Sequence, residues 1–141
     1  MKIKILLSIF LLFILGCNPN KVESVNLLNG YWEILKVKKD RKLIKEYGIS
    51  PTVDYFEITD SLTGFRKKVA PRLDGKFIVN DDQVNFTLKL ENDSLNIYYN
   101  QNDVLTKEII LKLDNEELII ANSQGFQYFY KPFKAINLGH E

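Results

Sequence analysis

The clearest pattern in the chain is a strict alternation of apolar and polar positions over residues 84–90, which resumes over residues 95–99. A period of two is typical of a β-strand with one buried face. Asn92-Asp93 lies between the two runs and supplies residues that tight turns favour. The segment therefore predicts an antiparallel hairpin. Its inward apolar positions are Val84, Phe86, Leu88 and Leu90, then Leu95, Ile97 and Tyr99.

The same pattern continues to the end of the chain. After a turn at 101–103, residues 104–113 predict a longer strand with Leu105, Ile109, Leu111 and Leu113 on its apolar face. Residues 118–120 and 126–130 predict another hairpin through the turn at 122–125, where Gly125 suits a positive φ. Pro132 cannot donate a ladder hydrogen bond and is expected to end the last strand.

The first half of the chain is less regular. Residues 31–37 predict a strand with apolar residues on both faces, which a bulge near Ile34 would reconcile. Residues 53–58, 65–69 and 76–79 predict three more strands, with turns at 71–75 and 80–82. Residues 39–49 are open to two interpretations, a short helical turn that uses Leu43, Ile44 and Tyr47 or a long polar loop.

These elements amount to eight or nine short strands and almost no helix. Turn signals recur about every 8–12 residues, the spacing of an antiparallel barrel or sandwich. A parallel sheet needs crossover helices, and the pattern contains none. We predict an all-β fold, an antiparallel up-and-down barrel of about eight strands, with a β-sandwich as the alternative.

The amino-terminal residues have the pattern of a targeting signal. Lys2 and Lys4 precede an uncharged apolar run from Ile5 to Leu15. As a helix this run would be about 17 Å long, against about 30 Å of bilayer hydrocarbon, so it predicts a secretory signal rather than a membrane span. Ile14-Leu15-Gly16-Cys17 resembles the bacterial lipobox, and the resemblance implies cleavage before Cys17 and acylation of that cysteine. An ordinary secretory signal with a chance cysteine is the alternative.

The expected organisation is a signal peptide at 1–16, a lipidated cysteine and tether at 17–26, a barrel domain at 27–133 and a carboxy-terminal tail at 134–141. Pro19 and the asparagines around it favour turn and extended chain over a regular element. We expect a cell-envelope protein held by membrane lipid through acylated Cys17, at the outer membrane, with the periplasmic and surface faces both open.

Composition excludes several classes of chemistry. The formal charge is +1, so the chain lacks the strong net positive charge that is typical of nucleic-acid-binding proteins. The single Cys excludes an intramolecular disulfide and a thiolate zinc cage, and the single His, His140, lies in the tail. We therefore expect no catalytic residue, no metal site, no cofactor and no enzyme activity. The carboxylates Asp54, Glu57, Asp81 and Asp82 are interpreted as solvated acids rather than a catalytic pair.

The opening Gly30-Tyr31-Trp32 is similar to the Gly-x-Trp start of lipocalin-like domains, and Tyr128-Phe129-Tyr130-Lys131 resembles the aromatic last strand of small bacterial lipocalin-like lipoproteins. The resemblance implies an eight-stranded barrel in which the Trp plugs one end. It also implies a small, mostly apolar molecule inside the barrel.

Seven aromatic side chains are candidates for the barrel interior or a ligand lining: Trp32, Phe56, Phe86, Tyr99, Phe126, Tyr128 and Tyr130. Two interpretations follow from them. One is a barrel that binds a small apolar or amphipathic ligand. The other is an envelope protein–protein interaction module whose core is filled by these side chains, as small barrels often are.

Overall fold

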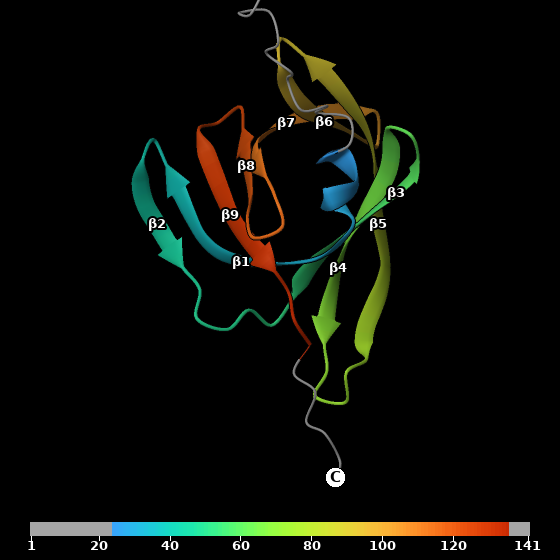
Figure 1. Ribbon diagram of the computed structural model, residues 1–141, viewed down its shortest axis with the longest axis vertical. Helices are drawn as coiled ribbons and strands as arrows, with labels where there is room; N and C mark the ends of the chain where they lie inside the picture. The colour runs from blue at the N-terminus through green and yellow to red at the C-terminus, as the bar shows by residue number, and fades with distance from the viewer. Residues whose placement is uncertain (1–23, 136–141) are drawn as a thin grey trace, which may run out of the picture.

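The computed structural model describes residues 24–135 and shows a short 3-10 helix followed by nine antiparallel strands in this part of the chain (Figure 1). The helix is η2 (Val25–Leu28). The strands are β1 (Gly30–Lys39), β2 (Lys42–Glu46), β3 (Val53–Asp60), β4 (Thr63–Pro71), β5 (Phe77–Glu91), β6 (Ser94–Gln101), β7 (Val104–Leu113), β8 (Leu118–Asn122) and β9 (Phe126–Pro132).

The sheet closes on itself because β9 pairs with β1 as well as with β8. Gly30–Trp32 of β1 pairs with β3, whereas Lys36–Lys39 pairs with β2, so β2 stands at the margin of the sheet with β1 as its neighbour. The fold is therefore an all-β, closed antiparallel barrel of eight strands, β1 and β3 to β9, with β2 added at the side. This confirms the predicted barrel over the sandwich.

Tight turns join several of the hairpins, and their central residues have positive φ. Asn92 and Asp93 have φ of 49° and 62°, as the sequence pattern predicts for a two-residue hairpin turn. Asp40 and Arg41 adopt the same conformation, with φ of 49° and 69°. The prediction of a helical turn or polar loop over 39–49 was therefore wrong, because this turn starts strand β2.

Strand β5 is a single strand of 15 residues. The turn predicted at 80–82 is absent, since Val79 pairs with Val69 and Gln83 pairs with Lys67 on the same neighbour. A register irregularity between Lys67 and Val69 lets the ladder continue through this point. The polar run at 80–82 thus lies within a strand.

Two further irregularities decide which side chains face inward. The bulge predicted near Ile34 is confirmed as a register shift between Ile34 and Lys36 against β9. On β7 the predicted apolar face was wrong, since Leu105 and Leu111 are 66% and 52% exposed while Ile110 is 8% exposed. A shift between Ile110 and Lys112 brings Leu113 back against the core.

The apolar core fills one end of the barrel, where η2 lies inside the ring of strands (Figure 1). The indole Nε1 of Trp32 donates a hydrogen bond of 2.9 Å to the Leu28 carbonyl, which fastens η2 to β1. Val25 is 2% exposed, so the folded domain includes residues before the expected start at 27. The buried cluster consists of Val25, Leu28, Trp32, Phe56, Phe86, Leu88, Ile97, Tyr99, Ile110, Leu118, Ile120 and Tyr130.

The predicted signal peptide, Cys17 and most of the predicted tether lie outside the described residues, as does His140 in the tail. Within residues 24–135, none of the helices has the length and apolar character needed to cross a membrane.

Candidate functional site

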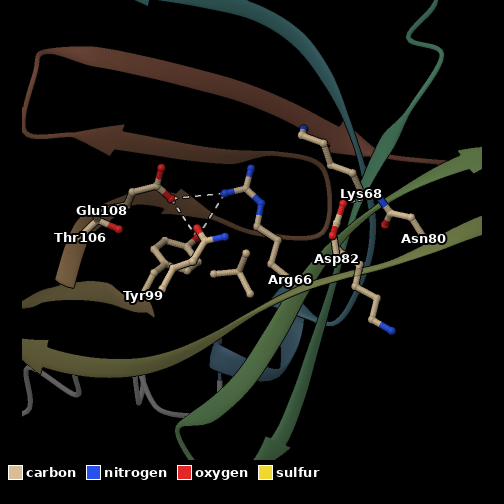
Figure 2. Close-up of a pocket in the computed structure, with 10 residues that line it drawn as sticks. Arg66, Lys68, Asn80, Asp82, Tyr99, Thr106 and Glu108 are labelled. Atoms are coloured by element: carbon tan, nitrogen blue, oxygen red, sulfur yellow. Dashed lines mark hydrogen bonds and ion pairs between the residues drawn. The ribbon is translucent and has the colours of Figure 1, made fainter. Parts of the chain in front are cut away.

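A charged cluster lies inside the barrel above the apolar core, with Arg66 of β4 at its centre. Arg66 shares its face of β4 with Gly64 and Lys68, because alternate residues of a strand point the same way. Its Nη2 lies 2.8 Å from Asp54 Oδ2 on β3, and its Nη1 lies 3.4 Å from Glu108 Oε2 on β7. The guanidinium therefore bridges two carboxylates from different strands. Figure 2 shows its contact with Glu108.

Two tyrosine hydroxyls and one ring complete the surroundings of Arg66. Its Nη1 donates to Tyr99 Oη at 3.2 Å, and its Nη2 donates to Tyr130 Oη at 3.0 Å. Tyr99 Oη in turn donates to Glu108 Oε2 at 2.9 Å, and the guanidinium carbon lies 5.0 Å from the centre of the Phe56 ring. Each terminal guanidinium nitrogen thus has two partners, and the group is held rigidly.

The burial of this cluster shifts the pKa of its members. Burial by itself would raise the pKa of Asp54, whose side chain is 3% exposed, but Arg66 and Lys68 outweigh this and hold it below its usual value. The Lys68 Nζ lies 3.0 Å from Asp54 Oδ1. Burial raises the pKa of both Tyr99 and Tyr130, so these hydroxyls stay protonated and able to donate.

An open cavity of about 440 Å³ adjoins the cluster, and Arg66, Tyr99 and Glu108 belong to its lining. Figure 2 shows Arg66 and Glu108 on one side of it, with Lys68, Asn80 and Asp82 on the other. Strand β5, for which the sequence predicted a turn at 80–82, supplies part of this wall. The lining residues are Arg66, Lys67, Lys68, Asn80, Asp82, Val84, Tyr99, Gln101, Thr106 and Glu108.

The groups that face this cavity suit binding by hydrogen bonds and charge. The Asp82 carboxylate accepts a hydrogen bond of 3.1 Å from the Asn80 amide and has no ion pair within residues 24–135. Glu108 contacts both Arg66 and Tyr99 through a single carboxylate oxygen, Oε2. No cluster of three or more His, Cys, Asp or Glu suited to a metal ion occurs in the described part of the chain.

A model of the lipocalin-like domain family matches residues 28–120. The chain belongs to this family. No protein in the curated set matches the chain.

Solved structures of similar shape come from bacteria and an animal. A lipocalin-like protein from Bacteroides uniformis is 11% identical, with a TM-score of 0.47 over 76% of this chain and 99% of that one. An uncharacterized protein from Bacteroides eggerthii is 12% identical, with a TM-score of 0.46 over 75% and 99%. Lobster apocrustacyanin A1 is 16% identical, with a TM-score of 0.44 over 84% and 67%.

The seven predicted interior aromatics occupy two zones of this lipocalin-like barrel. Trp32, Phe56, Phe86, Tyr99 and Tyr130 belong to the buried cluster, and Tyr128 packs against it. Phe126 is half-buried and stacks on Tyr128 with 6.3 Å between ring centres. Of the seven, Tyr99 lines the cavity.

The interpretation of Asp54 as a solvated acid was wrong, because the structure buries it against Arg66 and Lys68. Sequence reasoning also missed Arg66, Lys68, Thr106 and Glu108 as interior or lining residues. A signal for Asp54 was available, since it lies two residues from Phe56 and strand alternation places both on one face. Arg66 gave no such signal, because Phe65 and Val69 suggest the opposite face of its strand.

Proposed function

We propose that this protein is a lipid-anchored, lipocalin-like binding protein that holds a small amphipathic molecule in the open half of its barrel. The observation that carries the proposal is the cavity of about 440 Å³ beside the Arg66 cluster. Small-molecule sites commonly occupy about 300–1,000 Å³ and combine apolar walls with a few fixed polar groups. Membership of the lipocalin-like family supports the same use of the interior.

The chemistry of the walls favours a ligand with a polar group over a purely apolar one. Val84 and the ring of Tyr99 offer apolar contact, whereas Lys68, Asp82 and Glu108 offer charge. A purely apolar molecule would desolvate these charges without returning hydrogen bonds, which costs free energy. We therefore favour the amphipathic member of the two ligand types that the sequence predicts.

The anchor in this proposal is the acylated Cys17, which the lipobox resemblance supports. Cys17→Ala should release the protein from membranes, and detergent phase partitioning of wild-type and variant cells measures this. Variant protein that stayed in the detergent phase would contradict the anchor. We propose binding without catalysis, since the sequence has no His before His140 to activate a serine.

A cavity-filling substitution tests the ligand site. Thr106→Trp places an indole on the cavity wall and should weaken binding of the amphipathic dye 1-anilinonaphthalene-8-sulfonate at least tenfold, as measured by fluorescence titration. Thr87→Trp is the matched control, because Thr87 is exposed and does not line this cavity. Equal dye affinity in wild type, Thr106→Trp and Thr87→Trp would overturn the proposed site.

Native mass spectrometry of protein purified from its own membranes provides the second test. A co-purifying small molecule that Thr106→Trp excludes and Thr87→Trp retains supports the proposal. Ligand-free protein together with a stable protein complex in crosslinked cells would instead favour the interaction module.

A further inference from the structure

The hairpin formed by β1 and β2 concentrates positive charge, and its residues 36–46 are called the basic hairpin below. They contain six basic and two acidic residues, a net charge of +4, whereas the whole chain carries +1. None of these six cations forms an ion pair within residues 24–135. The cations are Lys36, Lys38, Lys39, Arg41, Lys42 and Lys45.

Aromatic rings hold four of these lysines in place. Lys36 and Lys38 lie 5.0 Å and 5.3 Å from the centre of the Phe129 ring. Lys39 lies 4.8 Å from the ring of Phe126, and Lys45 lies 4.5 Å from that of Tyr47. These contacts keep the ammonium groups extended at the surface without neutralising them.

The basic hairpin also exposes apolar side chains. Every residue of β2 is exposed, with Leu43 at 54% and Ile44 at 58%, and Ile49 beyond it is 92% exposed. Figure 1 places β2 at the periphery of the molecule with no strand beyond it. Lysines on an edge strand protect against pairing with other chains. Protection does not account for the uncovered leucine and isoleucines.

Other exposed apolar pairs on this protein lie next to acids. Val104 and Leu105 follow Asp103, and Ile78 and Val79 precede Asp81 and Asp82. The basic hairpin combines exposed aliphatic side chains with six cations that form no ion pair within the described residues. An anionic bilayer satisfies both, because its headgroups attract the cations and its interfacial layer takes up the aliphatic groups.

We propose that the basic hairpin is a docking surface for anionic phospholipid bilayers. Successive residues of a strand point to opposite faces, so the cations stand on both faces of the sheet and surround the Asp40-Arg41 turn. The β1 arm of the hairpin also pairs with β9, so the hairpin meets the headgroups with its tip and with the outer edge formed by β2. The contact is independent of Cys17 and of the barrel cavity.

Vesicle co-sedimentation tests the docking surface, with protein that begins at Ser24. The buried cluster lies wholly within residues 25–130, so this chain retains the closed barrel and its core. It should sediment with vesicles of phosphatidylcholine and phosphatidylglycerol, and not with phosphatidylcholine alone. Added salt should release it, because screening weakens each headgroup contact.

Matched variants locate the contact. Lys42→Gln/Lys45→Gln should lower the partition constant roughly ten- to thirtyfold, since each lysine near such a surface contributes about 1 kcal/mol. Lys76→Gln/Lys89→Gln removes the same charge elsewhere and should have little effect. Leu43→Ser/Ile44→Ser should weaken binding more than Val104→Ser/Leu105→Ser, although both pairs are exposed.

Several outcomes would overturn the docking surface. These are equal losses in the two lysine variants, equal sedimentation with both vesicle types, and binding to polyglutamate without binding to anionic vesicles. The last result would assign the hairpin to an acidic protein partner. Each protein is first checked by circular dichroism, and conservative Lys42→Arg/Lys45→Arg should keep full binding, which separates lost charge from lost folding.

Discussion

The two halves of the barrel interior are built in opposite ways. The end that contains η2 is filled with apolar side chains such as Leu28, Phe86 and Leu118, each at most 3% exposed. The other end contains Asp54, Arg66 and Glu108 and opens into a cavity of about 440 Å³. Apolar packing stabilises the first half. The second half buries charged groups, which are stable there only when they are paired. Under the proposed function, stability and binding are assigned to different ends of one barrel.

This division has a physical basis. Apolar burial contributes about 25 cal/mol per Å² and needs no particular partner. A buried ion pair contributes little net free energy, but removal of one partner leaves an uncompensated charge that is costly. The closed half should therefore respond to lost volume, and the open half to lost charge or lost hydroxyl groups.

The largest effect is expected from Phe86→Ala in the closed half. Phe86 is 3% exposed and its ring contacts those of Phe56 and Tyr99. The cavity created should lower the free energy of unfolding by about 3–5 kcal/mol. Urea denaturation measures the change, and Phe126→Ala, which truncates a half-buried ring, should lower it by less than half as much. Similar losses at the two sites would mean that the halves are not packed differently.

The next largest effect is expected from Asp54→Asn in the open half. The substitution conserves volume but leaves Arg66 without its 2.8 Å partner, so stability at pH 7 should fall by about 3 kcal/mol. Glu33→Gln removes a carboxylate that pairs with an exposed lysine, Lys131, at 3.3 Å and should cost less than about 1 kcal/mol. A loss at Asp54 no greater than that at Glu33 would contradict the importance of burial.

The same pair predicts a pH dependence. The pKa of Asp54 in the folded protein lies below its usual 3.8, so its contribution to stability is complete above that value. The contribution is lost as the pH falls through the folded-state pKa. The stability difference between wild type and Asp54→Asn should therefore narrow below about pH 4, as followed by denaturation at a series of pH values. A difference that stayed constant to pH 2 would show that Asp54 does not act through its charge.

The smallest effect is expected from Tyr99→Phe. The variant keeps the ring in the core but removes the hydroxyl that connects Arg66 and Glu108. The loss of these hydrogen bonds should cost about 1–2 kcal/mol, with dye binding altered because Tyr99 lines the cavity. Tyr31→Phe, on a half-buried ring outside the charged cluster, is the control and should change neither property.

Individual strands show which parts of the fold can be predicted from the sequence. The hairpin of β5 and β6 was predicted because its apolar residues alternate with polar ones around Asn92-Asp93, and one buried face is enough to impose that pattern. The inward face of β7 was not predicted, because the bulge between Ile110 and Lys112 changes the phase of the alternation. The pattern also did not predict β2. The side chains of this strand are all exposed, so no buried face imposes an alternation of apolar and polar residues on it.

The residues around the cavity likewise could not be predicted as a group from the sequence. Asp54 and Arg66 lie on the adjacent strands β3 and β4, and Tyr99 and Glu108 lie on the adjacent strands β6 and β7. The two pairs meet only because the sheet curls into a barrel. In β4 the apolar neighbours of Arg66 face outward, where the Phe65 ring lies 6.0 Å from that of Tyr55. On β4, therefore, apolar side chains point outward and the charged Arg66 points inward, which is the opposite of the usual arrangement.

The sequence alone determined most of the strands and hairpin turns and the all-β class, because alternation and turn chemistry are local properties of the chain. The sequence also contains the lipobox-like motif, which lies outside the described residues of the folded domain. Only the tertiary structure decided which charges are buried and where the interior stays open. Those features depend on contacts between strands far apart in the chain, and on bulges that change which face of a strand turns inward.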